Sequence, residues 1–208
     1  IFLNQRVIGS TAADSSVLNG NGALTVDNAG ALTAASILDG FFITNTTDNN
    51  IDNTGSAGVN INATFSNLII ANGRGGNGAG VYNAYSSPTF NNVIFRNNSA
   101  TGNGGAMYNI NGSSPVFNNV VFENNASTVN GGAMFNQGGA GPSNPVFTNV
   151  VFRNNTATAG GGMYNNSTSP IFNTVTFEGN TAGRGGGLYN YLNANPTFND
   201  VKIIGNVA

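Results

Sequence analysis

The chain repeats itself about every 25 residues. In each repeat a Pro-x-Phe segment precedes an aliphatic-x-Phe segment, an Asn, and a glycine-rich segment that ends in an aromatic residue and Asn. The clearest copies are residues 88–109, 115–136, 145–165 and 170–190, with a partial copy from residue 196 and weaker copies at 63–83, 37–45 and 17–22. Self-similarity at this period is typical of solenoids, in which each unit buries its apolar face against its neighbours.

Apolar and polar residues alternate within the three segments of each repeat, which indicates strands rather than helices. The Gly-Gly pair in the third segment also disfavours a helix. Like segments stacked coil on coil predict an all-β fold, a parallel β-helix (solenoid) of about eight coils with three strands per coil. The crossover rule predicts right-handed coiling.

One domain is expected over residues 1–208, with irregular N-terminal coils in residues 1–62 and regular repeats in residues 63–208. Residues 1–17 are the candidate cap of the first coil. Longer insertions between blocks, such as residues 138–144, are expected to be loops. One anchor residue per coil is expected to align: Leu18, Leu38, Phe65, Phe90, Phe117, Phe147, Phe172 and Phe198.

Composition excludes several functional classes. The 6 Lys and Arg against 8 Asp and Glu give no basic surface for nucleic acid. The absence of His and Cys excludes disulfides, Cys/His zinc sites and His-based triads. No apolar run is long enough for a membrane-spanning helix, so this segment is not expected to insert into a membrane. We expect no catalytic residues, no cofactor and no resident metal, in a processed or excised extracellular segment.

Alternation also predicts which side chains point inward. Four interior columns are expected: Phe90, Phe117, Phe147, Phe172 and Phe198; Val93, Val120, Val150, Val175 and Val201; Phe95, Phe122, Phe152, Phe177 and Ile203; and Val81, Met107, Met134, Met163 and Leu188. Two asparagine ladders are expected beside them: Asn98, Asn125, Asn155, Asn180 and Asn206, and Asn83, Asn109, Asn136, Asn165 and Asn190. An Asn amide can bond the Asn one coil away and tolerates the left-handed backbone of tight bends.

Two outward rows are candidate interaction residues. Arg96, Glu123, Arg153 and Glu178 occupy one aligned position with alternating sign, which predicts a charge ladder along the rod. Tyr82, Tyr108, Phe135, Tyr164 and Tyr189 form an aromatic row, interpreted either as a self-stacked column or as an exposed ridge for a protein or glycan. A third outward row, Thr89, Val116, Val146, Ile171 and Thr197, is mostly apolar.

The pairing of Phe-x-x-Asn with a following Gly-Gly-Ala-aliphatic segment is specific. It occurs as Phe95–Asn98 with Gly104 to Met107, and again as Phe122–Asn125 with Gly131 to Met134. This resembles the FxxN/GGA[ILV] repeats of the chlamydial polymorphic outer membrane proteins, a family of right-handed parallel β-helix repeat proteins of bacterial surfaces. The resemblance implies a secreted surface passenger that acts as an adhesin.

We therefore expect a non-catalytic extracellular structural and interaction module, either part of a bacterial surface adhesin or the stacking subunit of an extracellular filament. Its expected partners are other copies of the protein, stacked end to end, or host or cell-surface glycans. A carbohydrate-binding β-helix and a polysaccharide lyase or hydrolase remain the alternatives. The second would centre on Asp48 and Asp52, whose loop is either a solvated turn or a weak calcium site.

Overall fold

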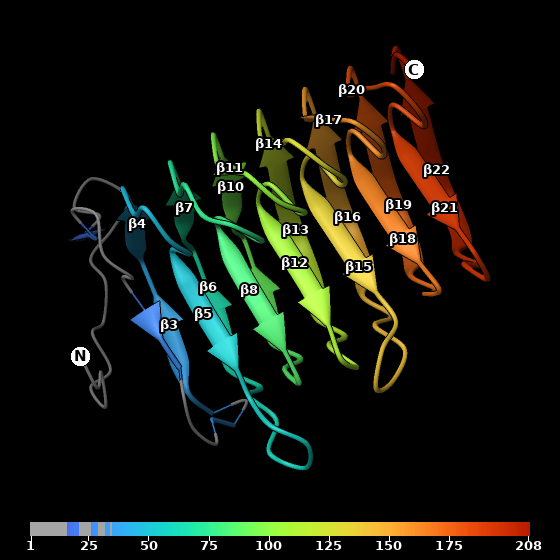
Figure 1. The fold of residues 1–208 in the computed structure, drawn as a ribbon. Helices are drawn as coiled ribbons and strands as arrows, with labels where there is room; N and C mark the ends of the chain where they lie inside the picture. Colours follow the sequence, from blue (N-terminus) through green and yellow to red (C-terminus); the bar gives the residue numbers. More distant parts are fainter. Residues whose placement is uncertain (1–15, 21–25, 29–31, 34) are drawn as a thin grey trace.

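The computed structural model describes residues 16–20, 26–28, 32–33 and 35–208 and shows a rod of stacked parallel β coils (Figure 1). The coils follow one another along the rod in sequence order, in about seven turns rather than the eight expected. The all-β parallel solenoid is therefore confirmed. Residues 1–15 of the candidate cap at residues 1–17 lie outside the described residues.

Three parallel sheets run along the rod. The largest has 11 strands, and a path of eight of them runs from end to end. That path is β1 (Ser16–Asn19), β4 (Phe41–Thr44), β7 (Ile69–Ala71), β10 (Ile94–Arg96), β13 (Val116–Glu123), β16 (Val146–Arg153), β19 (Ile171–Glu178) and β22 (Thr197–Ile204). Beside it lie β3 (Ile37–Asp39), β6 (Thr64–Ser66) and β9 (Thr89–Asn91).

The other two sheets are narrower. The seven-stranded sheet contains β2 (Val26–Asp27), β5 (Ile51–Thr54), β8 (Val81–Ala84), β12 (Met107–Ile110), β15 (Met134–Gln137), β18 (Met163–Asn166) and β21 (Leu188–Tyr191). The four-stranded sheet contains β11 (Ser99–Ala100), β14 (Ala126–Ser127), β17 (Thr156–Ala157) and β20 (Thr181–Ala182). Loops after β5 and β15 project from one edge of the rod, and the second is the loop expected at residues 138–144 (Figure 1).

Each coil contributes strands to three sheets, as predicted, but the segments that form these strands differ from the prediction. The Pro-x-Phe and aliphatic-x-Phe segments belong to one sheet, and in the last four coils they join into single eight-residue strands. A residue with positive φ bends each of these strands, for example Asn119 (φ 56°) and Asn149 (φ 54°). The four-stranded sheet, formed by two residues after each Phe-x-x-Asn, was not predicted. Register also corrects one anchor, because Leu18 aligns with Ile43 and not with Leu38.

Backbone contacts explain the Gly-Gly pair. Gly131 has a φ of +68°, in the left-handed region that favours glycine. Gly132 has no room for a side chain, because a Cβ there would lie 2.2 Å from the carbonyl oxygen of Gly161 in the next coil. The same arrangement recurs along the seven-stranded sheet, so the two glycines let successive coils approach closely.

The core consists of like side chains stacked along the rod, as predicted. Phe122 lies 4.6 Å from Phe95 and 4.8 Å from Phe152 between ring centroids, with the rings nearly parallel. The neighbouring phenylalanine column meets this one edge to face, with Phe117 at 5.6 Å from Phe122. The Val and Met columns are buried beside them, and Val201 and Leu188 in the last coil are partly buried. At that end Phe198 is 47% exposed and Ile203 is also exposed.

The first predicted asparagine ladder is fully hydrogen-bonded. The Nδ2 group of Asn125 donates to the carbonyl of Phe95 in the preceding coil and to Oδ1 of Asn155 in the next, both at 3.0 Å. Its Oδ1 accepts hydrogen bonds from the backbone N–H and the Nδ2 of Asn98, at 3.1 and 3.0 Å. The same pattern continues through Asn180 to Asn206. Every polar atom of this buried amide is therefore paired with a neighbouring coil.

The second ladder is continuous over the seven-stranded sheet. Each Nδ2 donates to the Oδ1 one coil further on at 2.7 to 2.9 Å, from Asn28 through Asn53, Asn83, Asn109, Asn136 and Asn165 to Asn190. The ladder thus extends two coils further toward the N-terminus than the repeat pattern predicted. It has one direction throughout, because the donor always lies on the N-terminal side.

Replacing a stacked core ring should be costly. We expect Phe122→Ala to lower the free energy of unfolding by ~3–5 kcal/mol, because a buried ring is lost and a cavity remains. Phe198→Ala is the matched control, with an expected loss of about 1 kcal/mol since that ring is half exposed. Urea unfolding followed by circular dichroism measures both values. Equal losses in the two variants would contradict the stacking account.

The buried ladder should matter more than an exposed one. We expect Asn125→Leu to destabilise the protein by ~1–3 kcal/mol for each donor of buried Asn98 left unpaired. Asn119 belongs to an exposed ladder, bonded to Asn92 and Asn149 at 3.2 and 2.8 Å. Asn119→Gly keeps the positive φ and should change stability by less than about 1 kcal/mol. The same urea titration tests both variants. A large loss of stability in Asn119→Gly, with little loss in Asn125→Leu, would mean that the exposed ladder stabilises the fold more than the buried one.

Candidate interaction surfaces

Alternation along the strands turns every second side chain away from the core, so the outside of the rod carries aligned rows. On the large sheet lie two rows of mostly β-branched residues, which are half-buried except for the exposed Ile171 and Thr197. The first contains Thr89, Val116, Val146, Ile171 and Thr197, and the second contains Ile69, Ile94, Val121, Val151 and Thr176. Parallel register fixes the members of each row one strand spacing apart, ~4.8 Å.

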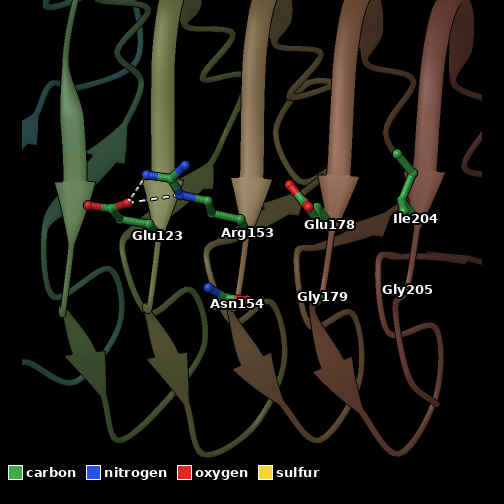
Figure 2. Close-up of a pocket in the computed structure, with 7 residues that line it drawn as sticks. All are labelled: Glu123, Arg153, Asn154, Glu178, Gly179, Ile204 and Gly205. Carbon is green, nitrogen blue, oxygen red and sulfur yellow. Dashed lines mark hydrogen bonds and ion pairs between the residues drawn. The ribbon is translucent and has the colours of Figure 1, made fainter.

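The charged row is in register, but its ion pairing is not continuous. Arg96, Glu123, Arg153 and Glu178 align on neighbouring strands as predicted. Within the described residues one ion pair forms, with Nε of Arg153 donating to Oε2 of Glu123 at 2.9 Å (Figure 2). Arg96 lies instead over the ring of Phe42, with Cζ 5.7 Å from the ring centroid. A role for this row in interactions stays a prediction.

An open groove lies beside the C-terminal half of the charged row (Figure 2). Its lining consists of Glu123, Arg153, Asn154, Glu178, Gly179, Ile204 and Gly205. These residues come from four neighbouring coils, and the charged ones among them have both signs. The groove therefore has polar, mixed-charge character.

The aromatic row is a covered column rather than an exposed ridge. Tyr108, Phe135 and Tyr164 are only 4–8% exposed. Each middle ring has a ring stacked on both faces, at centroid distances of 5.1 to 5.5 Å, and the hydroxyl of Tyr108 hydrogen-bonds Oε1 of Gln137 at 2.8 Å. Of the two interpretations of this row, the geometry favours the self-stacked column over its three middle rings, whereas Tyr82 and Tyr189 are partly exposed. A role for the row in interactions stays a prediction.

The C-terminal end of this column is accessible. Tyr191 lies beside Tyr164 and Tyr189, at centroid distances of 6.2 and 6.5 Å, and is 45% exposed. Burial raises the pKa of Tyr164, and the neighbouring Tyr189 and Tyr191 raise it further, while Arg184 acts in the opposite direction. The repeat pattern did not single out Tyr191, because the matching position in the preceding coil is Asn166.

The two acidic residues weighed as catalytic or calcium ligands already bind groups of their own chain. Oδ1 of Asp48 accepts a hydrogen bond from the backbone N–H of Asn49, and Oδ1 of Asp52 accepts one from the hydroxyl of Thr54. Among the described residues, no group of three or more acidic side chains is placed to hold a metal ion. The strand register places Asp27 beside Asp52, and Asp52 beside Tyr82. The positions that carry aromatic residues from Tyr82 onward therefore carry carboxylates in the two preceding coils.

Stability should depend on the ionisation of Asp52. Burial raises its pKa, the Thr54 hydrogen bond lowers it, and the charges of Asp27 and Asp48 raise it further. A carboxyl whose pKa is higher in the folded than in the unfolded state destabilises the fold as pH rises through that interval. We expect Asp52→Asn to be more stable than the natural chain at neutral pH, with the difference disappearing below about pH 4. Urea midpoints across this pH range test this, and parallel profiles would contradict it.

Comparison with known proteins agrees with the repeat pattern. The family model described as the Chlamydia polymorphic membrane protein (Chlamydia_PMP) repeat matches residues 92–109, 119–137 and 174–191. No curated protein and no solved structure matches the chain significantly. Across the part of the chain that is described, no helix is long and apolar enough to cross a membrane.

Each matched segment corresponds to the same part of a coil. It begins at the positive-φ bend of the large sheet, at Asn92, Asn119 or Thr174, and ends in the seven-stranded sheet. It therefore contains the buried Phe and Asn and the Gly-Gly approach that hold successive coils together. Three segments of this chain are therefore similar to the Chlamydia polymorphic membrane protein repeat, and they form equivalent parts of stacked parallel β coils.

Proposed function

We propose that this chain is a non-catalytic structural and interaction module on the outside of a bacterial cell, part of a surface adhesin. The observation that carries the proposal is the threefold match to a polymorphic membrane protein repeat on a continuous parallel β-solenoid. The family name places those repeats in a membrane protein.

The construction of the rod supports a mechanical role. Its inward side chains are used in the stacked columns, and its buried amides in the Asn98–Asn206 ladder bond neighbouring coils. The module holds its outward rows at fixed spacing, and repetition of one weak contact on several coils increases the overall affinity through multivalency.

The rows of β-branched residues on the large sheet are the proposed adhesive surface. Their members are half-buried or, at Ile171 and Thr197, exposed. They lie on adjacent strands and carry no charge from Ile69 to Thr176. An extended apolar strip of this kind is typical of protein contact surfaces. The adhesin's partner on this surface is a protein.

A second candidate function is glycan binding at the end of the aromatic column. Tyr189 and Tyr191 offer ring faces and hydroxyl groups side by side, and Tyr191 is exposed. Tyrosine combines an apolar ring with a polar tip, which suits partly apolar and partly hydrated ligands such as sugars.

Surface location and adhesion can be tested together. We expect antibodies to this chain to label intact cells of the source organism, and beads coated with the chain to bind target surfaces. Val121→Lys with Val146→Lys should abolish bead binding, because two charges interrupt the apolar rows. Thr128→Lys, an exposed change near the four-stranded sheet, is the matched control and should leave binding intact.

Three outcomes would count against these assignments. Labelling only after permeabilisation would refute a location on the cell surface. Binding that survives the double lysine variant would remove the large sheet as the adhesive face. Loss of binding in Tyr191→Ala, together with competition by free glycans, would favour the second candidate.

A further inference from the structure

The charged row of the large sheet keeps a charge without an ion pair at each of its ends. Its four residues lie in register on β10, β13, β16 and β19, with described coils on both sides of them. Figure 2 shows Glu123, Arg153 and Glu178 side by side along the rod. Among the described residues only Glu123 and Arg153 form an ion pair. Arg96 and the exposed Glu178 therefore remain available to charges of a partner.

The order of these four charges is self-complementary. In one direction along the rod the signs are plus, minus, plus and minus, and in the other direction they are minus, plus, minus and plus. A second copy laid on the row with its rod reversed therefore opposes Arg96 to Glu178 and Glu123 to Arg153. All four positions then face a charge of opposite sign. Identical chains most often associate by an isologous contact of this kind, in which each residue of a pair faces the other twice.

The uncharged row beside the charges matches in the same arrangement. Its members each precede a charged residue by two positions and so lie on the same face of the strand. They are half-buried: Ile94, Val121, Val151 and Thr176. On reversal Val121 faces Val151 and Ile94 faces Thr176. The reversed copy therefore brings apolar surface onto mostly apolar surface, and opposes no charge to an apolar side chain.

We propose that two copies of this chain associate face to face through these two rows, with their rods antiparallel. The two-fold axis runs parallel to the strands, between β13 and β16. This inference rests on the proposed function and identifies the protein partner of the large sheet as a second copy of the chain. Sheets packed face to face lie ~10 Å apart, a gap that facing Arg and Glu side chains can cross. Antiparallel rods belong to facing surfaces, so the contact fits adhesion between two cells that both carry the chain.

The same charges disfavour neighbouring registers. Moving the axis onto β13 opposes Arg96 to Arg153 and Glu123 to its own copy. Moving it onto β16 opposes Glu123 to Glu178 and Arg153 to its own copy. Like charges then face one another, which disfavours association. A two-fold axis along the rod would instead lay the charged row on the uncharged one, so the antiparallel register between β13 and β16 is the one that the charges select.

The face is small, so a single contact is weak. On each strand it is bounded by residues with positive φ, such as Asn119 (φ 56°) and Asn124 (φ 54°). At ~3.3 Å per residue and ~4.8 Å per coil, it measures roughly 16 Å by 24 Å, on the order of 400 Å² per copy. Stable complexes bury about 800 Å² per partner, and transient ones bury less. Facing surfaces that carry many copies would hold together through multivalency.

Sedimentation equilibrium of the 208-residue chain tests the proposal. We expect monomers and dimers at low ionic strength, and monomers in about 1 M salt, where the Debye length is about 3 Å. Arg96→Glu and Glu178→Lys each turn two facing pairs into like-charge pairs, and each should weaken dimerisation by about tenfold or more. Arg184→Glu is the matched control, an exposed charge reversal next to the four-stranded sheet, and should dimerise as the natural chain does.

Combining the two changes separates a contact between copies from a role in folding. An equimolar mixture of the Arg96→Glu and Glu178→Lys chains should form heterodimers, because all four positions again face opposite charges. The chain carrying both changes should dimerise by itself for the same reason. Like charges are neighbours within its own row, so a role in folding alone predicts no rescue. If a single variant does not fold, as judged by circular dichroism, the doubly changed chain decides. Its failure to dimerise would overturn the arrangement.

Failure of this inference differs from failure of the proposed function. A natural chain that stays monomeric up to its solubility limit would overturn the contact between copies. If beads coated with that chain still bind target surfaces that lack it, the adhesin stands with another protein as its partner. Dimers in solution, together with labelling of permeabilised cells only, would count against the proposed function and leave the self-contact intact.

Discussion

The fold depends on the hydrogen bonds of one buried amide repeated in each coil. In the Asn98–Asn206 ladder the side chain pairs with a carbonyl of the coil before and with an Asn of the coil after. A buried polar group left unpaired is destabilising, so the ladder forms only when the coils stack in one register. The phenylalanine columns supply the apolar burial, but stacked rings by themselves do not fix the position of one coil relative to the next. The amide, with its fixed donors and acceptor, therefore specifies the register of the coils, and the rings pack against one another in that register.

This constraint leaves the outside of the rod free to vary. Inward positions are occupied by Phe, Val, Met and Asn in coil after coil, whereas outward positions carry Thr, Val, Ile, Arg, Glu or Tyr. The rows on the surface have the same spacing as the strands, and their side chains are not part of the hydrophobic core. The ion pair between Arg153 and Glu123 illustrates the difference, since both groups are partly in solvent and contribute little to stability. A surface module built in this way can change its contacts while its rod is preserved.

Stacking also explains why the two ends of the rod differ from its sides. Along the sides each strand edge is paired, while at β22 the edge is open and interior columns reach solvent.

The repeat spacing alone determined the solenoid, the inward columns, the register from Phe65 onward and both asparagine ladders within the regular repeats, because each depends only on which residues recur at the same point of a coil. Tertiary structure decided the rest. Whether Tyr108 and Tyr164 are exposed depends on the rings stacked above and below them. The alternation of residues predicts which side chains point outward, but not whether neighbouring side chains bury them. The four-stranded sheet rests on two residues per coil, such as Thr156–Ala157, which are too few to show a period. The bend inside β13 lies at Asn119, and Asn or Asp recurs at this position as Asn92, Asn149 and Asp200, but that pattern does not tell whether the bend ends a strand or joins two of them.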